Sequence, residues 1–159
     1  MFDRRLFVIG LLTVLIAFAA GGSPGQEIGV ETDPIVVALH GRVSQFLESV
    51  SMGEAQDAYP KLLAGSPLLK QTDAIEELIQ RTGELKTKYG RSWAFERISV
   101  KRVGKDVALM TYLYKCESFP VVWYFTFYRT PAPGATGTEN AAWRVVIVRF
   151  DTQLELLGL

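Results

Sequence analysis

The sequence contains few of the residues that carry most catalytic and metal chemistry. Its 159 residues include one cysteine, Cys116, and one histidine, His40. One residue of each kind cannot form a zinc site, which needs several converging ligands. A single cysteine also excludes a disulfide within the chain. We interpret Cys116 as a half-buried small apolar residue, with a reactive thiol as the alternative.

Two further absences exclude whole classes of partner. The sequence holds no glycine-rich phosphate loop and no Gly-x-Ser-x-Gly elbow, so it predicts no cofactor. Its 17 basic residues balance 17 acidic residues. A balanced chain offers no basic field for nucleic acid and no polybasic patch for a membrane surface.

The first 25 residues have the order of a secretory signal peptide. A short basic start ends at Arg5, an apolar run extends from Leu6 to Ala20, and small residues follow as far as Gly25. Cleavage after Ala19 or after Gly25 fits this pattern. The alternative is an uncleaved membrane anchor, although a spanning helix usually needs about 20 apolar residues. We therefore predict a secreted or periplasmic protein without membrane contact after cleavage.

Residues 26–33 are expected to form a flexible lead-in, and residues 34–159 a single domain that begins with helices. Asp33 followed by Pro34 is typical of a helix start, and Gly53 of a helix stop. A second helix is predicted from Glu54 to about Leu63, with Pro60 expected to kink or split it. A third is predicted from residue 72 to Gly90, with a capping box from Asp73 to Glu76. The stripes predicted to be buried are Val36, Leu39, Val43, Phe46 and Val50 in the first helix, Ala55, Ala58, Tyr59 and Leu62 in the second, and Ile75, Leu78, Ile79, Thr82, Leu85 and Tyr89 in the third.

Four strands are predicted after the helices. They span residues 93–103, 107–116, 121–130 and 143–150, which are rich in β-branched and aromatic residues. Their short connections favour an antiparallel meander, and residues 131–140 are predicted to form a mobile hairpin loop. Helices followed by strands indicate an α+β fold, with N-terminal helices packed on a curved antiparallel sheet.

The register of the first hairpin decides which side chains share a face. A two-residue turn at Gly104-Lys105 would place Val103 opposite Asp106 and Val100 opposite Leu109. Further from the turn, this register pairs Ile98 with Thr111, Glu96 with Leu113, Arg97 with Tyr112, Phe95 with Tyr114 and Trp93 with Cys116. It predicts one face that holds Glu96, Ile98, Val100 and Leu113 together.

The order of elements resembles the nuclear transport factor 2-like superfamily, the cone-shaped, cystatin-like α+β roll of ketosteroid isomerase and the polyketide cyclases. Three segments carry the likeness: the short helix in Met52–Tyr59, the hairpin Val103–Ala108 and the last strand Trp143–Asp151. The resemblance implies a curved sheet wrapped around the first helix, a pocket between them and dimerisation through the sheet. No catalytic residue carries over, because no aspartate lies inside a predicted strand.

The remaining candidates for a site are one acid and a group of aromatic residues. Glu96 is the best acid, since the predicted register would bury it and favour its neutral form; the alternative is a strand-edge carboxylate in water or paired with a Lys or Arg. For His40 we prefer a histidine on the helix with its hydrogen bonds satisfied to a catalytic base. The aromatic residues on the second sheet face predict an interface or half of a dimer. The predicted ligand-binding residues are Glu96, Arg97, Tyr112, Tyr114, Tyr124 and Trp143, with Arg97 as an anion contact.

Three hypotheses follow from these residues. The first is an exported non-catalytic domain that binds a small apolar ligand or a protein partner and forms a homodimer through its sheet. The second is an isomerase- or cyclase-like enzyme with Glu96 as base and a tyrosine hydroxyl as donor. The third is a pure assembly module with a filled pocket. A cavity shared by Glu96 and a tyrosine hydroxyl would favour the enzyme, and a sealed core would exclude it.

Overall fold

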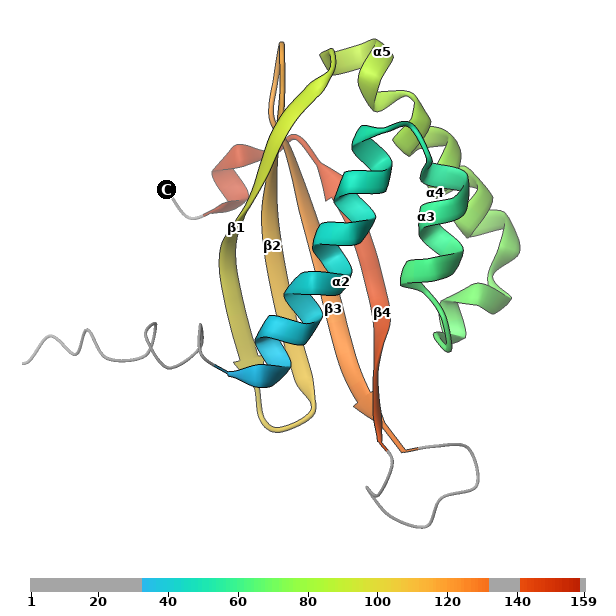
Figure 1. Ribbon diagram of the computed structural model, residues 1–159, viewed down its shortest axis with the longest axis vertical. Coiled ribbons are helices and arrows are strands. Elements are labelled where there is room, and N and C mark those ends of the chain that lie inside the picture. The colour runs from blue at the N-terminus through green and yellow to red at the C-terminus, as the bar shows by residue number, and fades with distance from the viewer. Residues whose placement is uncertain (1–32, 132–140, 158–159) are drawn as a thin grey trace, which may run out of the picture.

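The computed structural model describes residues 33–131 and 141–157, which form helices followed by one antiparallel sheet. Helix α2 (Pro34–Ser51) lies across one face of the sheet, and α3 (Ala55–Leu62) and α4 (Thr72–Gly83) lie beside it toward the β4 edge (Figure 1). The predicted α+β class is confirmed. The predicted signal peptide and nearly all of the loop at residues 131–140 lie outside the described residues.

Helix α2 begins and ends where the sequence indicates. The Asp33 carboxylate accepts a hydrogen bond from the amide of Ile35 at 2.8 Å and caps the helix. Gly53 has a φ of 87°, and its amide bonds the carbonyl of Val50. The stripe predicted for this helix is buried as a whole, together with Leu47.

Helix α3 is continuous through Pro60, so of the predicted kink or split the split is wrong. Pro60 is exposed, and the buried side of the helix is the predicted one, formed by Ala55, Ala58, Tyr59 and Leu62. A 3-10 turn, η1 (Pro67–Lys70), follows and is capped by Ser66, which accepts from the amide of Leu68.

The third predicted helix is divided into α4 and α5 (Leu85–Tyr89) at Glu84. Just before the division, the Thr82 hydroxyl donates to the carbonyl of Leu78 at 2.7 Å, a contact that bends helices. The predicted capping box is absent, because no side chain caps the start of α4. The buried stripe is as predicted, with Thr82 and Leu85 fully buried and the others partly buried.

The sheet is a meander in the order β1-β2-β3-β4, with every neighbouring pair antiparallel. Its strands are β1 (Ser92–Val103), β2 (Val107–Cys116), β3 (Val121–Thr130) and β4 (Ala142–Asp151). The predicted bounds of the second and third strands are reproduced without change. A terminal 3-10 turn, η2 (Leu154–Leu157; red in Figure 1), lies on the face of the sheet opposite α2.

The register of the first hairpin is partly as predicted. Arg97 lies opposite Tyr112, Glu96 opposite Leu113 and Phe95 opposite Tyr114, but Val103 pairs with Val107 and Val100 with Met110. Ser92, not Trp93, lies opposite Cys116, and Ser99, not Ile98, lies opposite Thr111. The turn contains Gly104, Lys105 and Asp106, and a bulge at Ile98 restores the predicted alignment beyond it. Val100 therefore faces the helices, and the predicted face shared by Glu96 and Val100 is wrong.

The core lies between the helices and the side of the sheet that faces them. Trp123, Tyr112, Phe125 and Phe127 are almost completely buried on this side. The Phe46 ring of α2 meets the rings of Tyr59, Trp123 and Phe125 edge-on, a favourable arrangement of aromatic rings. The opposite side of the sheet, which we call the outer face, alternates with these positions along each strand.

The edge of the sheet at β4 is closed by two side chains. Arg42 of α2 donates to the carbonyl of Trp143 at 2.7 Å, and the Ser66 hydroxyl donates to the carbonyl of Val145. These bonds occupy backbone groups that would otherwise be open to another strand, so they protect this edge from strand addition.

Candidate functional site

The six predicted ligand-binding residues do not converge on one site. Arg97, Tyr112, Tyr114 and Trp143 lie on the side of the sheet that faces the helices, whereas Glu96 and Tyr124 lie on the outer face. Only Arg97 and Tyr112 are directly opposite each other among the six. The face of each residue follows from the register and the bulge, which the sequence pattern did not reveal.

Glu96 is a surface carboxylate and not a pocket acid. Its side chain is 52% exposed and pairs with Lys115 of β2 at 2.9 Å. This is the paired strand-edge arrangement considered for it from the sequence. The burial that a pocket acid at Glu96 would need does not occur, because its strand neighbours Phe95 and Arg97 are the residues that face the helices.

Tyr124 lies on the outer face next to the C-terminal segment. The Arg149 guanidinium lies over its ring, 4.2 Å from the centroid, in a cation–π contact. Its hydroxyl is buried without a hydrogen-bond partner among the described residues. Burial raises the pKa of Tyr124, and the carboxylates of Asp151 and Glu155 contribute in the same direction, against Arg149. The influence of Glu155 shows that η2 lies near this ring.

Trp143 and Tyr114 fill packing positions at the two ends of the sheet. The guanidinium of Arg102 stacks 4.9 Å above the centroid of Trp143 and donates to the carboxylate of Asp33 at 2.9 Å. Tyr114 is buried beside Cys116, and burial raises the pKa of its hydroxyl. Cys116, predicted to be half-buried, is buried, and burial raises the pKa of its thiol.

A polar cluster lies where α2 crosses the first two strands. His40 Nδ1 and the Tyr112 hydroxyl are 2.7 Å apart, and their rings are stacked with centroids 5.8 Å apart. Burial lowers the pKa of His40, and the positive charge of Arg97 lowers it further. Burial raises the pKa of Tyr112, so its hydroxyl keeps its proton and donates whenever Nδ1 is unprotonated. His40 is thus the satisfied histidine that the sequence analysis preferred to a base.

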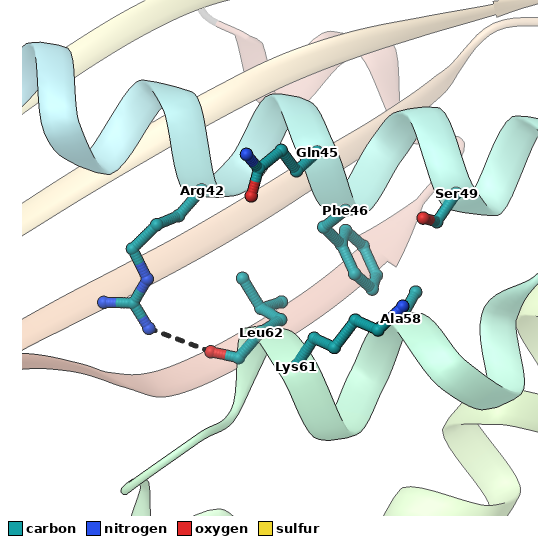
Figure 2. Close-up of a pocket in the computed structure, with 7 residues that line it drawn as sticks. All are labelled: Arg42, Gln45, Phe46, Ser49, Ala58, Lys61 and Leu62. Atoms are coloured by element: carbon teal, nitrogen blue, oxygen red, sulfur yellow. Dashed lines mark hydrogen bonds between the residues drawn. The ribbon is translucent and has the colours of Figure 1, made fainter.

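A groove lies between α2 and α3, with a volume of about 250 Å³. Figure 2 shows its residues, with Arg42 at one end of the α2 side and Ser49 at the other. The guanidinium of Arg42 leaves the groove wall toward the end of α3, where it donates to the carbonyl of Leu62 at 2.9 Å. Seven residues line the groove: Arg42, Gln45, Phe46, Ser49, Ala58, Lys61 and Leu62.

Sequence reasoning missed this groove, although a signal for it was present. Arg42, Gln45 and Ser49 recur at spacings of three and four along α2, which places them in one row beside the buried stripe. The partner of this row is α3, and only the packing of the two helices brings Lys61 alongside it.

The described residues contain no group of three or more His, Cys, Asp or Glu side chains that could hold a metal ion. Of the helices that the structure describes, none has both the length and the apolar character needed to cross a bilayer. No known protein-family profile, no characterised protein and no solved structure matches this chain.

Proposed function

We propose that this protein is an exported, non-catalytic binding domain of the nuclear transport factor 2-like superfamily that associates with a second copy through the outer face of its sheet. The observation that carries the proposal is an exposed apolar area on that face. The export signal and the superfamily rest on the sequence pattern, and the order of helices and antiparallel strands supports the latter.

The exposed apolar area is formed by four residues from all four strands, which we call the outer patch. Val103, Leu109, Tyr128 and Ile147 are exposed by 48%, 37%, 43% and 49%. Thr126 lies between Leu109 and Ile147, and Val107 lies between Val103 and Tyr128, so the four residues surround these two positions in one region of the outer face. An exposed apolar patch of this kind usually marks an interaction surface.

Another part of the outer face is covered by the chain itself. Val122 also points outward, since it alternates with the buried Trp123, yet its exposure is 0%. The C-terminal segment with η2 lies on this side of the sheet and approaches Tyr124. Within residues 33–131 and 141–157, the chain thus covers part of its outer face and leaves the outer patch exposed.

Charges of both signs lie elsewhere on the outer face. Glu96 and Lys115 form one opposite-charge pair toward the far end of β1 and β2, and Arg149 and Asp151 approach to 3.6 Å on β4. Beside the outer patch itself, Lys101 lies opposite Leu109 and Arg144 opposite Tyr128. A twofold interface would use this patch on both subunits, and dimerisation through the sheet is what the resemblance implies.

The helix-facing side of the sheet supports binding less well. Tyr112, Trp123 and Phe125 fill the space where the resemblance implies a pocket. The isomerase- or cyclase-like alternative has no support from the geometry. Glu96 lies on the opposite face of the sheet from Tyr112 and Tyr114 and is paired with Lys115, and neither Glu96 nor Tyr124 lines either of the two pockets that the structure describes. The small apolar ligand predicted for that space has no described cavity between α2 and the middle of the sheet.

The test is native mass spectrometry and sedimentation of the domain with Leu109→Lys and Ile147→Lys combined. We expect the unsubstituted domain to be a dimer without a bound small molecule, and the double variant to be a monomer, because two lysines would be desolvated in the interface. The matched control is Val37→Lys, which places a lysine on an exposed apolar position of α2, at 55% exposure, and should leave the dimer intact.

A monomeric unsubstituted domain at every concentration would contradict the proposal. A dimer that survives the double substitution would place the interface elsewhere. A small molecule released on denaturation would instead favour the ligand-binding hypothesis.

A further inference from the structure

The groove between α2 and α3 has a preformed apolar floor. Phe46, Ala58 and Leu62 form it, with exposures of only 2–3%. The Phe46 ring is held by edge contacts to Tyr59 at 4.9 Å and Trp123 at 5.4 Å between centroids. Because the floor is already ordered, a ligand that binds to it causes little further loss of conformational entropy. The floor therefore favours a flat or short apolar group packed against it.

The charge of the groove has one sign. Two of its seven lining residues, Arg42 and Lys61, are cations, and none is an acid. The Arg42 guanidinium is anchored by the carbonyls of Leu62 and Trp143, so its charge is fixed at the wall. Lys61 forms no ion pair within the described parts of the chain, and its ammonium group remains available. A groove of this kind selects for an anionic group.

Two neutral polar groups complete the wall. The Gln45 amide and the Ser49 hydroxyl line the groove, and neither side chain forms a hydrogen bond with another described residue. Both can donate to an oxygen atom that a lysine ammonium does not reach. Arg42 and Ser49 lie seven residues apart on α2, which corresponds to about 10 Å along the helix axis. That length suits a ligand of single-ring size.

We propose that this groove is a binding site for a small amphipathic monocarboxylate, with its aromatic or short aliphatic body on Phe46, Ala58 and Leu62 and its carboxylate at Lys61. Gln45 and Ser49 donate to the carboxylate, and the fixed charge of Arg42 adds long-range attraction. The site is separate from the outer patch: its two helices lie on the other side of the sheet (Figures 1 and 2). It therefore does not depend on the proposed dimer.

The test titrates the whole domain with benzoate and, separately, with benzamide, its neutral counterpart of the same shape. Binding is followed through the backbone amide chemical shifts of the domain. We expect benzoate to produce saturable shifts confined to α2 and α3, with an affinity in the millimolar to high micromolar range typical of so small a ligand. Benzamide should bind at least about tenfold more weakly, because the charge-assisted contact is lost.

Variants of Lys61 separate charge from structure. Lys61→Met should lower the affinity for benzoate by about tenfold, and Lys61→Arg should keep most of that affinity, because charge-assisted hydrogen bonds are stronger than neutral ones. Lys70→Met removes an equally exposed lysine from η1 outside the groove and should change nothing. Unchanged spectra of the free variants, apart from the substituted region, show that the fold is intact.

Three results would overturn the proposal. Benzoate that causes no saturable shifts shows that the groove is not a carboxylate site. Equal affinities of benzoate and benzamide, or of the unsubstituted domain and Lys61→Met, show that charge plays no part. Shifts centred on another part of the chain place the binding elsewhere.

Discussion

Single residues join the layers of this fold at a few polar points. Arg42 links α2 to the end of α3 and to the β4 edge through two hydrogen bonds from one guanidinium. Arg102 links the start of α2 to the first hairpin, by donating to Asp33 and to the carbonyl of Lys105. His40 links the middle of α2 to Tyr112 in the sheet. Each of these contacts connects elements that are far apart in the chain.

The His40 contact predicts a pH dependence of stability. Burial lowers the pKa of His40 below its ordinary value of 6.5, so the unfolded chain takes up this proton at a higher pH than the folded protein does. The group therefore costs no stability well above pH 6.5, and the free energy of unfolding falls as the pH drops through 6.5 toward the lower value of the folded state. Urea unfolding between about pH 7.5 and 5.5 measures this slope.

The matched variant for this prediction is His40→Gln. His40 is the only histidine in the sequence, so its replacement should remove the histidine contribution to the slope. Tyr112→Phe, which deletes the hydroxyl, should cost about 0.5–1.5 kcal/mol at neutral pH. A slope of the same size with and without His40 would contradict the assignment.

At the scale of elements, the local sequence of α3 is unfavourable for a helix, and tertiary packing stabilises the helix. Its interior proline has no amide to donate and crowds the carbonyl four residues earlier. Its other side is buried against α2 through Ala58 and Leu62. Tertiary burial thus overrides the local preference that predicted a break.

Replacing this proline should stabilise the protein. Pro60 is exposed, so Pro60→Ala removes no packing and restores one helical hydrogen bond. The gain in helix propensity is about 3 kcal/mol, reduced by about 0.4–1 kcal/mol because the unfolded chain becomes more flexible. We expect a net increase of about 2 kcal/mol in the free energy of unfolding, measured with urea. Gln56→Ala on the same exposed side is the control, and a loss of stability in Pro60→Ala would contradict this account.

At the scale of the whole molecule, the sheet has one side inside the core and the other only partly covered. Helices cover most of the first side, and the C-terminal segment covers part of the second. The outer patch is an apolar surface to which all four strands contribute one exposed residue. Its burial in a dimer would make stability depend on protein concentration.

This dependence gives a second measurement of the proposed dimer. A tenfold rise in concentration stabilises a dimer by about 1.4 kcal/mol, which for chains of this size raises the thermal midpoint by about 2–4 °C. The combined Leu109→Lys and Ile147→Lys variant should show a midpoint that does not change with concentration. A concentration-independent midpoint in the unsubstituted domain would contradict self-association.

Much of the architecture could be predicted from local sequence. The strands at residues 107–116 and 121–130 have the predicted bounds; the first two predicted helical stripes are buried, and the third is buried at Thr82 and Leu85 and partly buried elsewhere. Periodicity determines these features because a helix or a strand repeats its side-chain directions at a fixed interval. One helix end was predicted correctly and another was not: Asp33 caps α2 as expected, whereas α4 has no side-chain cap.

The candidate site could not be predicted, because it depends on tertiary geometry. A three-residue turn and a bulge at Ile98 turned Val100 toward the helices, whereas Glu96, beyond the bulge, keeps its predicted partner Leu113 and lies in solvent beside Lys115. A strand changes face with every residue, so one inserted residue reassigns all side chains between the turn and the bulge. The sequence by itself determined the helices, the strands and the meander. Only the packing of distant segments decided that Lys61 meets the α2 row, that His40 bonds Tyr112, and that the outer patch stays uncovered.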